Sequence, residues 1–383
     1  MLLSKGFEVE MYTGTPAGEV VGFSDKIVAA LDSFVREPDT RNVEYTTAPF
    51  CRYEHLLCEL IKPRVRLRSY LKTLGDYTII PGSTLPLGGA QEFHRSDPKN
   101  PYHDYIEQTY GTNVVTASIH INIGMSDLEE LMRACRLIRL EAPLYLALSA
   151  SSPFFDGNVT GFHSTRWQMF PQTPQHVPLF ESHLHHIRWV EDQLAAGSMQ
   201  SVRHLWSSVR PNGDRRPYNL NRLELRICDL VSDPLHLLAI TTLLEARLQQ
   251  MLATPELDPL ESSQLSEQTR SEDLLEITLE NEKAVAANSL NATLRHWQDG
   301  RAITAQDWIN QMYDEVRPFA QAAGIGCFLT PIKQILRDGN QAQRWLAEAE
   351  KSTPTQVIQG AIAQMQQQES LLAQEVCQSA LVA

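Results

Sequence analysis

A short stretch near the start of the chain alternates apolar and acidic residues with period two. In residues 6–12, Phe7, Val9 and Met11 alternate with Glu8 and Glu10. Such alternation predicts a half-buried β-strand whose apolar side chains face a core and whose carboxylates share the opposite face. For this stretch alone, a solvated sheet surface is the simpler interpretation.

Three later segments repeat this pattern, each with one apolar face and one face that carries polar or charged groups. They are residues 42–47 with Glu44, residues 113–124 with His120 and Asn122, and residues 221–229 with Glu224 and Arg226. We expect these strands to lie side by side in an antiparallel sheet, with helices packed on its apolar face. The prediction is an α+β fold whose curved, mainly antiparallel sheet bears the site.

The remaining segments alternate between predicted helices and loops. Helices are expected near residues 26–35, 53–74, 127–150, 178–196, 234–253, 271–300, 304–324, 331–349 and 355–378, with a short strand at 77–80 and a turn at 209–213. Residues 83–110 form a predicted long loop that lines or covers a site. We expect residues 1–383 to be a single catalytic domain with its strands mostly within 1–232, a helical part at 233–383 and a peripheral tail beyond 350.

The charge and composition of the 383 residues exclude some classes of protein. A net charge of -13 argues against a nucleic-acid partner, although arginines or metal ions can attract an anion locally. No apolar run reaches the ~18 residues of a membrane span, so we expect no membrane partner. The start lacks the apolar region of a signal peptide, and six scattered cysteines predict reduced thiols in a cytoplasmic protein.

Two other clusters are not expected to be sites: one is a basic run on a solvated helix face, and the other is a set of surface or edge histidines. Lys62, Arg64, Arg66 and Arg68 form a basic run on a predicted helix. The histidines at 183, 185 and 186 lack the i, i+4 spacing of a helical metal site.

The four glutamates would repel one another on a shared sheet face unless cations lay among them. Oxygen-rich ligand sets favour Mg²⁺ or Mn²⁺, and one imidazole is compatible with both. Carboxylate-held divalent ions with arginines are typical of sites that bind a nucleoside triphosphate and transfer its γ-phosphate. The chain has no Walker A or kinase motif, and the pattern does not identify the phosphate acceptor. A metal- or nucleotide-binding regulatory protein and a metal-dependent hydrolase remain alternatives.

Six motifs resemble, in order, those of the carboxylate–amine ligase family, most closely the glutamate–cysteine ligase branch of cyanobacteria. They are G-F-E-V-E-M-Y-T-G, V-E-Y-T-T-A-P-F, S-I-H-I-N-I-G, L-A-L-S-A-S-S-P-F-F-D-G, T-G-F-H-S-T-R and R-L-E-L-R-I-C-D, within about residues 5–350. The resemblance implies a fold similar to glutamine synthetase and guanidino kinases. It also implies an ATP- and Mg²⁺-dependent reaction, with Mn²⁺ as a possible substitute. Glutamate's γ-carboxylate would become γ-glutamyl phosphate, and cysteine's amine would then displace phosphate to give γ-glutamylcysteine, the first step of glutathione biosynthesis.

The resemblance also implies roles for individual residues. The implied metal ligands are Glu8, Glu10, Glu44, His120 and Glu224. Arg226 would contact the transferred phosphoryl group of ATP, which makes Glu224 and Arg226 the implied catalytic residues, and Arg166 would hold the glutamate substrate. Asn122 replaces a histidine common in the family and is not assigned as a ligand. No motif marks the cysteine site, so a ligase for a different amine or acid remains an alternative, and the oligomeric state stays open.

Overall fold

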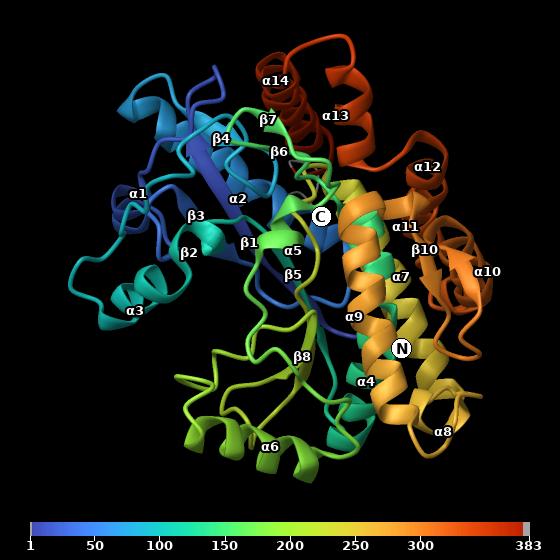
Figure 1. The fold of residues 1–383 in the computed structure, drawn as a ribbon. Helices are drawn as coiled ribbons and strands as arrows, with labels where there is room; N and C mark the ends of the chain where they lie inside the picture. The colour runs from blue at the N-terminus through green and yellow to red at the C-terminus, as the bar shows by residue number, and fades with distance from the viewer. Residues whose placement is uncertain (1, 378–383) are drawn as a thin grey trace.

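The computed structural model describes residues 2–377, and a seven-stranded antiparallel sheet is its central element (Figure 1). The strand order is β2-β3-β1-β5-β9-β8, and β4 also pairs with β1. The strands are β1 (Lys5–Gly14), β2 (Phe34–Arg36), β3 (Asn42–Thr46), β4 (Thr78–Ile80), β5 (Ile119–Gly124), β8 (Val209–Asn212) and β9 (Arg222–Leu225). The four strands predicted to carry the site are therefore direct neighbours, as expected.

Helices cover the apolar face of this sheet. Phe7, Val9, Ile121 and Leu225 on that face are each at most 1% exposed. The chief helices of this layer are α2 (Tyr53–Leu74), α4 (Leu128–Ser149) and α7 (Pro234–Ala253), and α7 contacts both of the others. Their burial leaves the opposite face of the sheet for polar side chains.

The other helices surround this arrangement. They are α1 (Ser24–Ala30), α3 (Pro101–Tyr110), α5 (Thr165–Met169), α6 (His183–Ala195), α8 (Pro259–Ser262), α9 (Arg270–Asn288), α10 (Ala305–Ala322), α11 (Gly326–Leu329), α12 (Pro331–Asp338), α13 (Gln341–Ala349) and α14 (Pro354–Leu372). Two small hairpins lie outside the main sheet, β6–β7 (Phe154–Phe155, Asn158–Val159) and β10–β11 (Thr293–Arg295, Ala302–Thr304). The mixed helical and antiparallel character agrees with the prediction.

Several predicted elements were wrong in type or extent. Residues 209–212 form the edge strand β8 rather than a turn, because proline is tolerated where a strand has a free edge. The predicted helix at 26–35 ends at Ala30 and β2 follows it. The loop at 83–110 contains α3, and α9 ends at Asn288 instead of near residue 300.

The C-terminal helix α14 packs against α2 and β4, so the tail is not peripheral. On α2, Arg68 donates to Glu369 at 2.8 Å, and Arg64 lies 3.5 Å from the same carboxylate. These two arginines are buried, so the prediction of a wholly solvated basic run was wrong.

A disulfide joins Cys58 of α2 to Cys377, at the end of a π-helical turn that follows α14. The expectation that all six cysteines are reduced thiols was therefore wrong for this pair. Local sequence pattern could not predict this pairing, because 319 positions separate the two cysteines. Cys51, Cys135, Cys228 and Cys327 are free thiols.

Within residues 2–377, none of the helices combines the length and the apolar character that crossing a membrane requires. The cytoplasmic location stays a prediction.

Candidate active site

The polar face of the sheet gathers the glutamates and the histidine that the sequence singled out. On β1, Glu8 pairs in register with His120 of β5, and Glu10 pairs with Glu44 of β3. One strand further, Asn122 of β5 pairs with Glu224 of β9. Antiparallel pairing brings these side chains together because directly opposed residues point to the same face.

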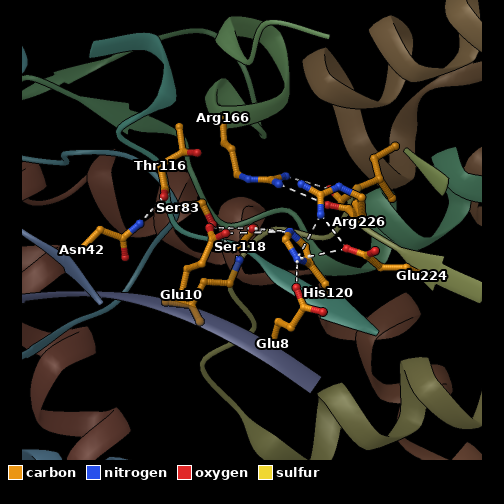
Figure 2. Close-up of polar contacts among 12 residues, drawn as sticks. Glu8, Glu10, Asn42, Ser83, Thr116, Ser118, His120, Arg166, Glu224 and Arg226 are labelled. Carbon is orange, nitrogen blue, oxygen red and sulfur yellow. Dashed lines mark hydrogen bonds and ion pairs between the residues drawn. The ribbon is translucent and has the colours of Figure 1, made fainter. Parts of the chain in front are cut away.

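Glu8, His120 and Glu224 form one group of potential metal ligands, with one ligand atom of each within 4.8 Å of the others. His120 Nδ1 lies 2.9 Å from Glu8 Oε2 and 3.5 Å from Glu224 Oε1 (Figure 2). Ser118 Oγ lies 3.1 Å from the other ring nitrogen of His120. Burial and Glu224 would raise the pKa of Glu8, but His120 and Arg226 together hold it below its ordinary value.

Glu224 is fully buried and held by two arginines. Arg210 donates to both of its oxygens, at 2.7 and 3.1 Å, and Arg226 donates to Oε1 at 2.5 Å. Asn212 donates to Oε2 at 2.6 Å. Burial alone would raise the pKa of Glu224, but the charges of Arg210, Arg226 and His120 hold it well below its ordinary value. Glu224 is therefore an ionised carboxylate with a fixed orientation.

Glu10, Glu37 and Glu44 form a second group with the same spacing between ligand atoms. Burial raises the pKa of Glu37 well above its ordinary value, and the charge of Glu10 adds to this effect. Burial likewise raises the pKa of Glu44, followed by repulsion from Glu37, Glu8 and Glu10. Three crowded carboxylates of this kind need either protons or cations to relieve their repulsion.

The chemistry of the two groups fits hard divalent cations. One offers two carboxylates and an imidazole, and the other offers three carboxylates, so oxygen dominates both sets. Oxygen-rich ligand sets suit Mg²⁺ and Mn²⁺. The sequence predicted five of these six candidate ligands and several cations among them, and the structure places the six side chains in two groups; their role as metal ligands stays a prediction.

Arg166 belongs to α5, and its side chain lies beside Arg226 (Figure 2). Its Nη1 donates to the carbonyl of Ile227 at 3.0 Å, and its Nη2 donates to the carbonyl of Arg226 at 3.1 Å. Its Nε is buried and has no hydrogen-bond partner among the described residues. Each Nη carries a second N–H, and Arg166 lines a cavity at this site, so the guanidinium retains donors for a ligand.

Two cavities adjoin at Glu8. The first, of about 430 Å³, is lined by every residue of the two ligand groups except the buried Glu224, and by Arg166, Arg226 and three residues of α3, Tyr102, His103 and Ile106. The predicted loop at 83–110 thus reaches the site through its helical end. The second cavity, of about 710 Å³, lies at the start of β1 and the end of β5 and is lined by Thr46, Asn122 and Arg222. Glu8 lines both cavities, so a ligand extending between them would pass this carboxylate.

The sequence interpretation missed two residues of this site. Glu37 follows β2, in the stretch left unassigned between the helix predicted at 26–35 and the strand predicted at 42–47, and a single glutamate before a proline carried little signal. Arg210 lies on β8, where Pro211-Asn212-Gly213 suggested a turn. An arginine directly opposite Glu224 in register would have been visible only once β8 was placed beside β9.

Comparisons with known proteins agree with this geometry. The family model described as glutamate-cysteine ligase family 2 matches residues 4–378. A protein of Rubrobacter xylanophilus, provisionally named glutamate–cysteine ligase 2-1, is 27% identical over 295 residues, which are 75% of this chain and 74% of the relative. A protein of Sorangium cellulosum, provisionally named glutamate–cysteine ligase 2, is 27% identical over 290 residues, 74% and 73% of the two chains.

Two solved structures share the fold. The glutamate–cysteine ligase of Francisella tularensis in complex with AMP has a TM-score of 0.73 at 13% identity, over 96% of this chain and 89% of that one. A bifunctional glutathione synthetase from Pasteurella multocida has a TM-score of 0.73 at 15% identity, over 98% of this chain and 53% of that one. At these identities the likeness establishes the fold only.

The fold, the site and the family match define an ATP-dependent carboxylate–amine ligase. Over nearly its whole length, the chain belongs to glutamate-cysteine ligase family 2. The comparisons support the family but do not single out its cyanobacterial branch, which stays a prediction. The likeness to glutamine synthetase and guanidino kinases also stays a prediction.

Proposed function

We propose that this protein joins the γ-carboxylate of L-glutamate to the amine of L-cysteine, with ATP as the phosphoryl donor. The products are γ-glutamylcysteine, ADP and phosphate, which makes this the first step of glutathione synthesis. The observation that carries the proposal is the convergence of two sets of candidate metal ligands and two arginines at one cavity. This cavity adjoins a second one at Glu8. Family membership supplies the substrate pair.

ATP would occupy the 710 Å³ cavity, with its phosphates directed past Glu8 towards the two sets of candidate metal ligands. Glu8, His120 and Glu224 would hold one divalent cation, and Glu10, Glu37 and Glu44 would hold another. Bound Mg²⁺, or Mn²⁺ in its place, would neutralise the phosphate oxygens and the negative charge that develops on ADP. Arg226, oriented by Glu224, would contact the phosphoryl group in transfer.

The acid substrate would occupy the 430 Å³ cavity, with a carboxylate at the guanidinium of Arg166, which lines this cavity. A γ-carboxylate oxygen attacks the γ-phosphorus, the bond to the bridging oxygen of ADP breaks, and γ-glutamyl phosphate forms. The cysteine amine then attacks the acyl carbon, phosphate leaves, and the nitrogen loses one proton. The wall formed by α3 would shield the acyl phosphate from water.

A substrate panel tests this proposal. Purified protein receives Mg²⁺, ATP and glutamate with cysteine, serine, alanine, glycine or 2-aminobutyrate, and ADP release is measured. We expect ADP release to be fastest with cysteine and to require glutamate. If cysteine gives no faster release than the other amines, the amine assignment fails and a ligase for another amine takes its place. If no acid stimulates ADP release, the ligase proposal itself fails.

A further inference from the structure

Asp229 is a fully buried carboxylate that the reaction steps above do not use. It lies four residues beyond β9 and ends the motif R-L-E-L-R-I-C-D. Burial raises its pKa, and Arg166 is first among the groups that oppose this shift. A buried carboxylate is costly unless its oxygens are fully hydrogen-bonded or paired, so the partners of Asp229 are informative.

Asp229 accepts hydrogen bonds from the two segments that flank hairpin β6–β7. Its Oδ2 accepts from the backbone N–H of Ser151 at 2.9 Å and from Ser152 Oγ at 2.8 Å. Its Oδ1 accepts from Ser164 Oγ at 2.9 Å and lies 3.7 Å from Arg166 Nη1. One carboxylate thus ties together the segment after α4 and the start of α5.

The two serine hydroxyls transmit the orientation of Asp229 to α5. Ser152 Oγ accepts from the backbone N–H of Arg166 at 3.2 Å, and Ser164 Oγ accepts from that of Trp167 at 3.2 Å. An ionised carboxylate only accepts, so each hydroxyl must give its proton to Asp229 and keep its lone pairs for these N–H groups. The charge of Asp229 therefore fixes the direction of the whole hydrogen-bond chain.

The side chain of Arg166 meets the same segment from the other side. Its Nη atoms donate to the carbonyls of Arg226 and Ile227, three and two residues before Asp229. The Arg166 side chain is 2% exposed, and its Nη1 forms an ion pair with Asp229. Segment 224–229 thus carries Glu224 and Arg226 and also holds the backbone and the side chain of Arg166.

We propose that Asp229 is a positioning residue that holds Arg166, through Ser152 and Ser164, where its guanidinium lines the cavity proposed for the acid substrate. This inference rests on the proposed role of Arg166 in binding that substrate. Asp229 itself touches no substrate, so its effect should pass through Arg166.

Substitution of Asp229 by asparagine tests the inference, because Asp229→Asn keeps the size of the side chain but removes its charge. We expect the KM for glutamate to rise about tenfold or more, as for the loss of a charged hydrogen bond, while the KM for ATP changes less than about twofold. Asp233→Asn, at the N-cap of α7, is the matched control and should leave both values unchanged, because asparagine caps as well as aspartate.

A double-mutant cycle with Arg166→Ala shows whether Asp229 acts through Arg166. In the Arg166→Ala background, Asp229→Asn should add little to the KM for glutamate. Fully additive effects, or equal changes in the KM for ATP and for glutamate, would overturn the inference. If Asp229→Asn does not fold, Ser164→Ala keeps the carboxylate and should raise the KM for glutamate by a smaller factor. An unchanged KM in Ser164→Ala would then overturn the inference.

A crystal structure of Asp229→Asn, or of Ser164→Ala if the former does not fold, separates this inference from the proposed function. We expect the Arg166 side chain to leave the carbonyls of Arg226 and Ile227. Arg166 in its original place would overturn the positioning role whatever the substrate is. If wild-type protein lacks glutamate-dependent ADP release but Arg166 still moves in the variant, the proposed function fails and the positioning role stands.

Discussion

Glu224 combines complete burial with a fixed negative charge. Arg210 binds both of its oxygens, Arg226 binds one, and their charges outweigh the effect of burial on its pKa. A carboxylate oriented in this way can serve a cation and an arginine at once, without moving during the reaction.

Glu224→Gln should remove that charge at nearly constant volume. We expect kcat to fall by a factor on the order of 10²–10³, because Arg226 and the cation held with Glu8 and His120 would lose the anion that they share. Turnover with cysteine and Mg²⁺ binding by calorimetry are the measurements, with exposed Glu54→Gln as the matched control. Near-native turnover together with near-native metal affinity would rule out the assigned role.

Arg210→Lys should weaken the hold on Glu224, since a lysine cannot reproduce the two parallel hydrogen bonds of a guanidinium. We expect kcat to fall about tenfold or more, with an unchanged far-ultraviolet circular dichroism spectrum. Exposed Arg52→Lys is the control. Unchanged kcat in Arg210→Lys would show that Arg226 and Asn212 suffice to orient the carboxylate.

Among the helices, α6 buries one histidine that was predicted to be exposed. His186 is 2% exposed and packs edge-on against Phe180, although all three histidines of this helix were expected at the surface. Burial lowers the pKa of His186 to about 3, and the neighbouring His183 and His185 act in the same direction. Its Nδ1 has no hydrogen-bond partner among the described residues, so the folded protein holds this ring neutral.

Because the His186 ring is neutral in the folded protein, we expect the protein to lose stability at acidic pH. The unfolded chain takes up the proton near pH 6.5 and the folded one only near pH 3, so the free energy of unfolding decreases as pH falls below 6.5. At pH 5.5 the contribution is about 1.4 kcal/mol. Urea unfolding at pH 7.5 and 5.5 should show a smaller decrease in His186→Leu than in wild type or in exposed His176→Leu. An equal decrease in all three would contradict the prediction.

The sequence alone predicted the four strands that carry most of the site, but it did not predict two neighbouring strands or the site residues on and beside them. Period-two alternation marked β1, β3, β5 and β9, because burial on one face dictates that pattern. It did not mark β8, whose Pro211 has no strand on its other side, or β2, which is only three residues long. Arg210 and Glu37 were missed with those strands, since their place depends on pairing between segments far apart in the chain.

At the scale of the whole molecule, the C-terminal helix is attached to the layer behind the sheet. Cys377 is bonded to Cys58 of α2, and Glu369 of α14 meets Arg64 and Arg68 of the same helix. Both contacts join segments that the sequence interpretation treated as a core helix and a peripheral tail. Neither pairing could be predicted from the sequence, because local pattern carries no information about partners about 300 positions away.

Cys58→Ser should lower the free energy of unfolding by about 2–4 kcal/mol under non-reducing conditions. Denaturant unfolding measures this change, and a reductant should lower the stability of wild type towards that of the variant. Cys327→Ser, which removes a free exposed thiol, is the control. Equal stability of wild type and Cys58→Ser without reductant would mean that the disulfide does not form in solution.

Rapid-quench measurement of ADP in the absence of any amine tests the proposed phosphoryl transfer most directly. With Mg²⁺, ATP and glutamate, the wild-type protein should release close to one ADP per active site in a fast phase, as γ-glutamyl phosphate accumulates. Omitting glutamate, or substituting Glu224 by glutamine, should abolish that phase. If ADP forms only after cysteine is added, the two-step reaction at this site is contradicted.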